Sequence, residues 1–242
     1  MRIVTVIQAR MSSARLPGKV LRDVAGATML ARVVQRARRA TLVEETLVAT
    51  SLDPGDDLIV SECARLEVRC FRGDREDVLD RYYRAAQEAR AEAVVRVTAD
   101  NPLVDPQLID ELLRAFLQKR PDFASNGLQP TYPLGLGVEV MTMPALERAW
   151  KEASRAQERV HVTPYLSQNP GLFNVLSVTG EADHSPHRWT VDTEEDMEFA
   201  RRVYAHFSDD RFGWRDVLRL VSEHPELEEL NRHVRQKTPQ EL

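Results

Sequence analysis

Short apolar runs alternate with amphipathic segments along the first part of the chain. The apolar runs lie at residues 3–7, 46–51, 68–71 and 93–98. The segments between them carry apolar residues at helical spacing, which predicts helices near 28–40, 56–66 and 76–90. Strands rich in Val, Ile and Ala that are separated by helices are typical of a mostly parallel sheet with helices on both faces. We therefore predict a three-layer α/β/α protein whose ligands bind beyond the carboxyl ends of the strands.

The regular alternation stops after Pro121, where proline, glycine and an Asn-Gly pair punctuate the chain. We interpret residues 121–180 as an inserted segment that covers the active edge of the sheet or forms a subunit interface. Within and after it, the pattern predicts strands at 138–141, 173–178 and 189–191 and helices at 144–156, 193–206, 214–223 and 225–235. Residues 208–242 form a helical C-terminal segment, and the whole of 1–242 is predicted to be one domain.

Composition and charge narrow the class of ligand. The chain has 242 residues with 33 Lys and Arg against 38 Asp and Glu, a formal net charge of −5. No apolar run approaches the ~18 residues that a membrane helix needs, so we expect a cytoplasmic protein without a membrane partner. A negative protein with one short basic loop suits a small phosphorylated ligand better than a nucleic acid, which would need a broad basic face.

That basic loop follows the first predicted strand. Residues 10–39 contain eight basic residues and one acidic residue. Arg32, Arg36 and Arg39 fall on the polar face of the next predicted helix, and we expect them to be solvated. Arg10, Arg15 and Lys19 have no such place in a helix. They are interspersed with serines and a glycine that offer hydroxyl groups and backbone amides: Ser12, Ser13 and Gly18.

This loop could hold a triphosphate, although ordinary surface cations are the alternative interpretation. It is neither a P-loop, which needs Gly-Lys-Ser/Thr at a helix start, nor the three-glycine fingerprint of dinucleotide folds. A different nucleotide-binding fold is therefore predicted.

The loop resembles that of the CMP-KDO and acylneuraminate cytidylyltransferases, which activate acidic sugars. The matching residues are Ile7, Ala9, Arg10, Ser13, Arg15, Leu16, Pro17, Gly18, Lys19 and Leu21. The Gln-Ala-Arg-Met at the start of the loop, together with residues 74–83, looks more like the branch named for the spore-coat polysaccharide protein SpsF. The resemblance extends through residues 95–103, 135–140 and 191–196. The sequence departs from the CMP-KDO synthetases at Gln8, Ala99 and Asn101, where that group has Pro, Gly and Glu.

The resemblance implies a nucleotide-diphospho-sugar transferase fold, similar to glycosyltransferase A. It implies transfer of CMP from CTP to the hydroxyl of a small, acidic or 2-keto sugar for polysaccharide biosynthesis, with release of pyrophosphate. Mg²⁺ would be the cofactor, with Asp100 and Asp192 as its ligands. A homodimer built on residues 121–180 is also implied. The nucleotide would be bound by Ala9, Arg10, Ser12, Ser13, Arg15, Gly18 and Lys19, with Arg10, Arg15, Lys19 and Asp100 as catalytic groups. The sugar would be bound by Asp74, Glu139 and Arg188.

Several of these residues have structural alternatives. Asp74 precedes a predicted helix and would favour its positive end. Glu139 alternates with apolar neighbours and could face water, and Asp192 could be a helix cap. Asp100 could merely begin a turn before Asn-Pro. At the level of function, the alternatives are a glycosyltransferase that uses a preformed nucleotide sugar and a non-catalytic nucleotide-binding module.

Overall fold

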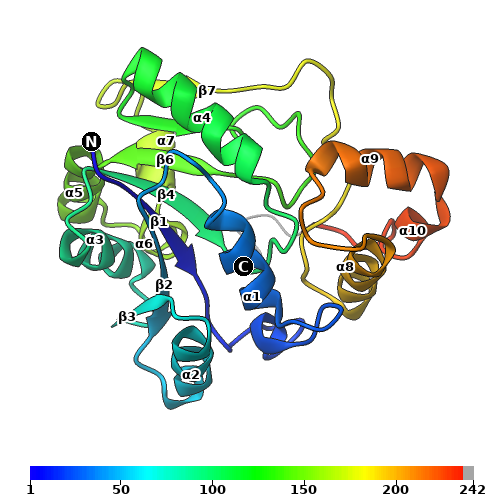
Figure 1. Cartoon of the computed structure of the whole chain (residues 1–242). Helices are drawn as coiled ribbons and strands as arrows, with labels where there is room; N and C mark the ends of the chain where they lie inside the picture. The colour runs from blue at the N-terminus through cyan, green and yellow to red at the C-terminus, as the bar shows by residue number, and fades with distance from the viewer. Residues whose placement is uncertain (237–242) are drawn as a thin grey trace.

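One seven-stranded sheet runs through the protein, whose computed structural model describes residues 1–236 (Figure 1). The strands are β1 (Ile3–Gln8), β2 (Glu45–Ser51), β3 (Arg69–Gly73), β4 (Ala93–Thr98), β5 (Phe123–Ser125), β6 (Glu139–Thr142) and β7 (Val175–Ser177). Their order across the sheet is β3-β2-β1-β4-β6-β5-β7. The first four strands are parallel, whereas β6 is antiparallel to β4 and β5. The prediction of a mostly parallel sheet is thus confirmed.

Helices cover both faces of the sheet. One face carries α1 (Met29–Ala37), α2 (Asp57–Arg65) and α4 (Pro106–Lys119), with α8 (Glu194–His206), α9 (Trp214–Glu223) and α10 (Glu226–Glu229) packed beside them. The other face carries α3 (Val78–Glu88), α5 (Met143–Glu152), α6 (Ala156–His161) and α7 (Pro164–Ser167). Two short 3-10 turns, η1 (Lys19–Leu21) and η2 (Pro54–Asp56), lie near the carboxyl ends of β1 and β2. Within residues 1–236 no helix combines the length and the apolar character that crossing a membrane requires.

Strand β1 shows why the parallel strands are almost continuously apolar. Ile3 and Ile7 belong to the core beneath α1, and Val4 and Val6 belong to the core beneath α3. All four side chains are at most 3% exposed. Because both faces are buried, every position of the strand gains from removing apolar surface from water. The strand ends at Gln8, and the loop that follows leaves the sheet at its carboxyl edge.

Residues 121–180 contribute to the sheet itself. They supply β5, β6 and β7 on one side of β4, and the helices α5, α6 and α7 on one face. The irregular part of this segment, residues 126–137, connects β5 to β6 and lies over the ends of the strands. The segment predicted as an insertion therefore forms part of the central layer, and its irregular part lies at the carboxyl edge of the strands.

The predicted strand at 189–191 is wrong. These residues hydrogen-bond to two loops instead of to a strand. The Trp189 amide donates to the Leu134 carbonyl oxygen at 2.7 Å, and the Val191 amide donates to the Asp100 carbonyl oxygen at 2.9 Å. An apolar run that is buried between loops has the same sequence signature as a strand, because both reflect burial.

The expectation that Arg36 is solvated is also wrong. Its side chain is 1% exposed and donates hydrogen bonds to the carbonyl oxygens of Val104, Asp210 and Phe212. The segment before α9 folds over the polar face of α1, so a position that helical periodicity assigns to solvent is covered by chain from far away in the sequence. The guanidinium replaces water as the partner of three buried carbonyl groups.

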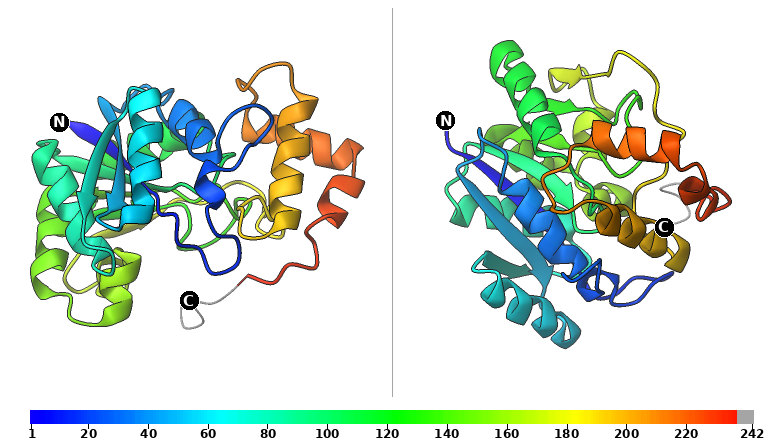
Figure 2. Two further views of the ribbon diagram at one scale, coloured as in Figure 1. Left: turned by 90° about the horizontal axis from the view of Figure 1, so that it is seen from below. Right: turned by 45° about the vertical axis from the view of Figure 1, so that its right-hand side comes forward.

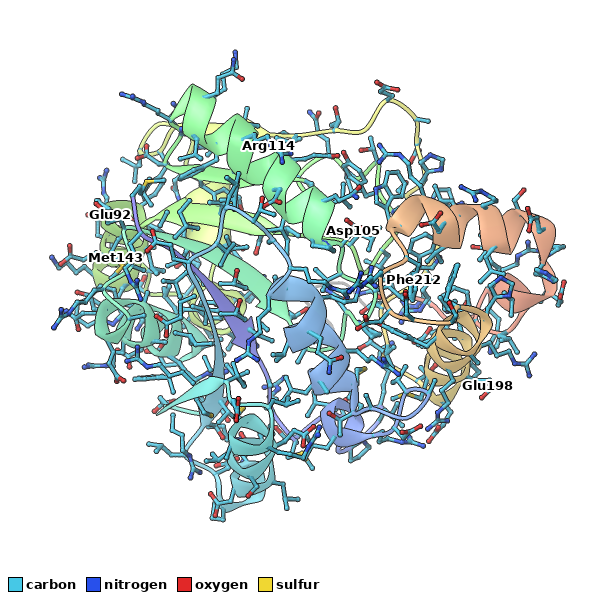
Figure 3. The ribbon with its side chains drawn as sticks, in the orientation of Figure 1. Glu92, Asp105, Arg114, Met143, Glu198 and Phe212 are labelled. Atoms are coloured by element: carbon cyan, nitrogen blue, oxygen red, sulfur yellow. The ribbon has the colours of Figure 1, made fainter. Side chains whose placement is uncertain are left out.

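Helix α4 is missing from the sequence prediction, although its start carries ordinary signals. Asp105 accepts hydrogen bonds from the amides of Gln107 and Leu108, and proline occupies the first turn. The second carboxylate oxygen of Asp105 accepts from the Trp214 amide at 2.7 Å. Asp105 therefore joins the start of α4 to the start of α9 (Figure 3).

Candidate functional site

A cavity of about 750 Å³ opens at the carboxyl edge of the parallel strands. Its wall is formed by the loop after β1, the end of β4, residues 126–137, the end of α6, and the segment before α8. In the left view of Figure 2, the blue loop after β1 and the red segment after α10 project on the same side of the molecule. The cavity thus lies where the topology of a parallel α/β sheet places ligands.

The loop after β1 is held in shape by backbone hydrogen bonds at its neck. The Ala9 amide donates to the Ala49 carbonyl oxygen at 3.1 Å, and the Gly18 amide donates to the Met11 carbonyl oxygen at 2.9 Å. Gly18 has φ +69°, a left-handed conformation that favours glycine, and it leads directly into η1. The loop therefore delivers Lys19 to the cavity from a fixed turn.

Lys19 lies between the two carboxylates that were predicted as metal ligands. Its Nζ atom is 3.1 Å from Asp100 Oδ2 and 2.9 Å from Asp192 Oδ1, and it donates to the Val191 carbonyl oxygen at 2.7 Å. The residue is only 7% exposed. Although burial opposes the charged form, the pKa of Lys19 is raised because both carboxylates favour the ammonium.

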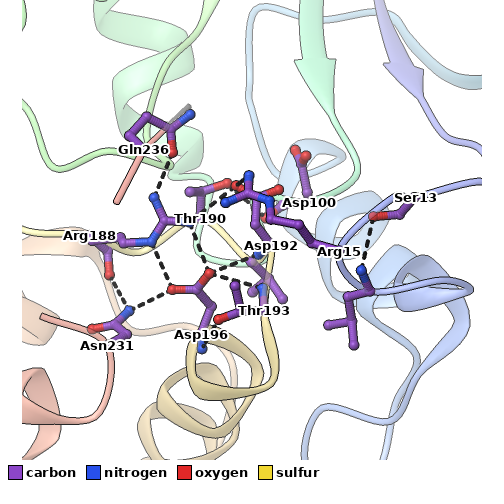
Figure 4. Close-up of polar contacts among 12 residues, drawn as sticks. Ser13, Arg15, Asp100, Arg188, Thr190, Asp192, Thr193, Asp196, Asn231 and Gln236 are labelled. Atoms are coloured by element: carbon purple, nitrogen blue, oxygen red, sulfur yellow. Dashed lines mark hydrogen bonds and ion pairs between the residues drawn. The ribbon is translucent and has the colours of Figure 1, made fainter. Parts of the chain in front are cut away.

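Asp192 has more cationic neighbours than Asp100. Arg15 Nη2 is 2.7 Å from its Oδ2 atom, and Arg188 Nη2 is 3.1 Å from the same oxygen (Figure 4). Although burial opposes ionisation, the pKa of Asp192 is lowered by Lys19, Arg15 and Arg188. A carboxylate with three cationic neighbours is ionised at neutral pH.

Arg188 is itself fixed from behind by a buried acid. Its Nε and Nη2 atoms donate to the two carboxylate oxygens of Asp196 at 2.8 and 2.9 Å, a bidentate arrangement. Asp196 is fully buried and also accepts hydrogen bonds from the Asn231 side chain and the Asp192 amide. Thr193 caps α8, as one of the two predicted caps, so Asp192 is left free to face the cavity.

A close approach of two backbone segments brings Asp192 beside Asp100. The Val191 amide reaches the Asp100 carbonyl oxygen, and residues 189–190 pass directly against Gly135. Gly135 has φ +113°, and a Cβ atom there would lie 2.6 Å from the Thr190 nitrogen. Only glycine fits that approach, which gives a physical reason for the Gly-rich stretch noted in the sequence.

The structure gathers most of the predicted nucleotide and metal residues around the cavity. These are Ala9, Arg10, Ser12, Ser13, Arg15, Lys19, Asp100 and Asp192. Gly18 supports the loop without lining the cavity. Asp74, Glu139 and Arg188 also lie outside its lining. Asp74 is exposed and accepts hydrogen bonds from the amides of Glu76 and Asp77 in the turn before α3.

Glu139 does not line the cavity, but it contacts Arg96, which does and which the sequence analysis did not select. Its Oε2 atom is 2.6 Å from Arg96 Nη1, and its Oε1 atom accepts a hydrogen bond from the Thr163 hydroxyl at 2.8 Å. Arg96 lines the cavity, as does Thr98, whose hydroxyl donates to Asp100 Oδ1. Residues 96, 98 and 100 alternate along one strand and its end, so the period of two would have identified them.

The carboxylates suit a small divalent cation. Asp100 and Asp192 converge on one ammonium group, so their oxygens already face a common point. Among the described residues there is no cluster of three or more Asp, Glu, His or Cys side chains that could hold a metal alone. Mg²⁺ commonly binds through one or two carboxylates together with substrate phosphates, so this incomplete set fits that ion.

Comparisons with known proteins show which proteins this chain is similar to. The family model described as cytidylyltransferase matches residues 4–237. The spore coat polysaccharide biosynthesis protein SpsF of Bacillus subtilis is 34% identical over 213 residues, 84% of this chain and 86% of that protein. A cytidylyltransferase structure from Leptospira borgpetersenii has a TM-score of 0.92 at 30% identity, covering 98% of this chain and 100% of that one. The structure of CMP:2-keto-3-deoxy-manno-octonic acid synthetase complexed with CTP has a TM-score of 0.67 at 20% identity, covering 85% of this chain and 99% of that one.

Proposed function

This chain belongs to the cytidylyltransferase family, and from that premise we propose that it transfers the cytidylyl group of CTP to a hydroxyl group of a sugar. The enzyme class is nucleotidyltransferase. One observation carries the proposal: the cationic loop after β1 meets the carboxylates of Asp100 and Asp192 in a single cavity.

The donor chemistry explains why cations surround this cavity. The sugar oxygen forms a bond to the α-phosphorus of CTP, and the bond from that phosphorus to the bridging oxygen of the β-phosphate breaks. The hydroxyl proton is released, and negative charge builds on the leaving pyrophosphate. Arg10 lines the cavity without an ion pair among the described residues, and Arg15 also lines it and pairs with Asp192. We assign both guanidinium groups, together with Lys19, to stabilising the charge of the phosphates.

Asp100 and Asp192 are the residues that would hold Mg²⁺. A divalent ion bound to them would stabilise the α-phosphate as a Lewis acid and lower the pKa of a hydroxyl group near it. In the protein without a bound ion, Lys19 pairs with both carboxylates, and Arg15 and Arg188 also pair with Asp192. Arg188 then acts on Asp192, which it orients, rather than on the sugar as the sequence alone suggested.

The acceptor is assigned to the part of the cavity that the phosphate loop leaves free. That part is lined by Arg96, Asn126 and Tyr132 among others. We propose an acidic or 2-keto sugar destined for a surface polysaccharide, as the names of SpsF and of the CMP-KDO synthetase suggest. Arg96 is the cation available to the carboxylate of such a sugar, which would compete with Glu139 for the guanidinium group.

Product analysis separates this proposal from the alternatives. The protein would be incubated with each nucleoside triphosphate, Mg²⁺ and a panel of 2-keto acid sugars, and pyrophosphate release would be followed. Release that requires both CTP and one sugar supports the proposal. Sugar transfer from a CMP-, UDP- or GDP-sugar would identify a glycosyltransferase instead, and CTP binding without turnover would identify a binding module.

A further inference from the structure

Asp56 is a buried acid that lies outside the cavity yet contacts the loop that enters it. It ends η2, directly before α2, and is 2% exposed. Its Oδ1 atom accepts a hydrogen bond from the Met11 amide at 2.8 Å. Its Oδ2 atom accepts from the Thr50 hydroxyl at 3.0 Å and from both the amide and the hydroxyl of Ser51. One carboxylate therefore joins the end of β2 to the loop after β1.

Met11 is the residue through which that contact acts on the loop. Its amide is held by Asp56, and its carbonyl oxygen accepts the Gly18 amide at 2.9 Å. The backbone of Met11 thus closes the neck of the loop formed by residues 11–18. A Cβ atom on Gly18 would lie 3.3 Å from the Met11 side chain, so the two ends of the loop are in contact. Lys19 follows immediately.

We propose that Asp56 is a positioning residue for nucleotide binding. It fixes the backbone of Met11, so that the cations of the loop face the cavity before CTP arrives. The inference rests on the proposed function, because it assumes that this loop binds the triphosphate. The carboxylate touches neither phosphate nor sugar, and its effect passes through Met11 and Gly18 to Lys19.

The charge of Asp56 matters for this role. All four groups that face its oxygens are donors, and an ionised carboxylate can accept from every one of them. Although burial raises it, the pKa of Asp56 is lowered by the hydrogen bonds from Ser51, Met11 and Thr50. An asparagine would keep an acceptor for the Met11 amide but would turn an N–H group toward the Ser51 amide, whereas an alanine would lose every one of these bonds.

The neighbouring acid supplies a matched control. Asp57 has 64% of its side chain exposed and pairs with Arg72 at 2.6 Å, without touching the loop. We would measure the dissociation constant for CTP in the presence of Mg²⁺ by calorimetry for the wild type, D56A, D56N and D57N. The loss of affinity is expected to be about 10-fold or more in D56A, about 3-fold in D56N and less than about 2-fold in D57N.

Melting temperatures separate positioning from simple support of the fold. Equal affinity in D56A and the wild type, with only a lower melting temperature, would overturn the inference. Should D56A fail to fold, amide exchange in the wild type decides: the Met11 amide is expected to exchange at least about 100-fold more slowly than a free loop amide. Exchange at the free rate would also overturn the inference. If the wild type itself does not bind CTP, the proposed function fails, while slow Met11 exchange would still show the anchoring of the loop.

Discussion

Each hydrogen-bond donor of the Lys19 ammonium group already has an acceptor within the protein. Its ammonium group has three N–H bonds, and three acceptors surround it: two carboxylates and the Val191 carbonyl oxygen. Meeting a phosphate would require it to exchange one of these partners. Removal of Lys19 therefore affects the charge balance of the site as well as phosphate binding.

The first prediction concerns Lys19 and Arg15, two of the three cations that contact Asp192. K19A and R15A should each weaken CTP binding by about 2–4 kcal/mol, because each removes a cation that would meet a phosphate in the cavity. Calorimetric titration with CTP and Mg²⁺ tests this. R22A is the control, since Arg22 pairs with the exposed Glu194 and does not line the cavity. Unchanged CTP affinity in both folded variants would remove the loop from the mechanism.

The carboxylates give the second prediction. D100N and D192N should retain the fold, lose at least about 100-fold in turnover and need much more Mg²⁺ for the remaining activity, because each loses a charged metal ligand. Pyrophosphate release as a function of Mg²⁺ concentration measures both effects. D183N, at an exposed loop position, is expected to behave like the wild type. If D192N keeps the wild-type response to Mg²⁺, the metal is bound elsewhere.

Single residues show how far the sequence leads. The loop residues Arg15 and Lys19 could be selected because no helical or strand pattern accounts for them. Arg36 was misjudged because its burial depends on a distant segment, Asp210 to Phe212, that no local pattern reveals. Asp56 was missed for the same reason, since its partner Met11 is 45 positions away.

At the scale of elements, helices with a clear apolar face were predictable and irregular segments were not. The predicted helix at 214–223 agrees with α9, and the strand β1 was predicted to within one residue. The strand predicted at 189–191 is wrong because an apolar run buried between loops has the same sequence pattern as a strand. The close approach that replaces the strand depends on Gly135, whose role only the backbone geometry shows.

The third prediction tests that approach. G135A should lower the free energy of unfolding by more than about 2 kcal/mol, because a Cβ atom would clash with the Thr190 backbone and φ is positive. Urea denaturation measures the loss. G137A is the matched control, as a Cβ atom at Gly137 meets nothing within 4 Å. Equal stability of the two variants would mean that residues 189–190 can move away from Gly135 at little cost.

The fourth prediction concerns how the contribution of Asp56, directly before α2, to the free energy of unfolding depends on pH. The pKa of Asp56 is lowered in the folded protein relative to its usual value of 3.8. Its contribution to stability is therefore full above that value and is lost as pH falls through the folded pKa. The difference in unfolding free energy between wild type and D56N should be largest at pH 7 and should shrink toward pH 3. Denaturation at both pH values measures it, and a constant difference would contradict the prediction.

At the scale of the whole molecule, the two halves of the site come from distant parts of the chain. The cationic loop follows the first strand, and Asp192 precedes α8 near the other end of the sequence. The parallel topology could be predicted from the alternation of strands and helices, and with it the edge at which these residues meet. The cover formed by residues 126–137 could not, because its path follows from contacts and not from a repeating pattern.

The last prediction is that two copies of the chain associate through residues 121–180. This segment exposes two large apolar side chains, Leu128 at 36% and Leu172 at 42%, although it already supplies three strands to the sheet. A partner copy could bury these apolar side chains, and two-fold dimers are the commonest assembly. Light scattering at micromolar concentration should give twice the chain mass of 27.6 kDa.

L128E and L172E should weaken the dimer at least about 10-fold, because each places a charge in the apolar contact. L58E is the control, since Leu58 on α2 is 58% exposed but lies outside the segment. A monomer in the wild type, or a dimer that L58E disrupts while L128E and L172E do not, would assign the exposed leucines of residues 121–180 another role.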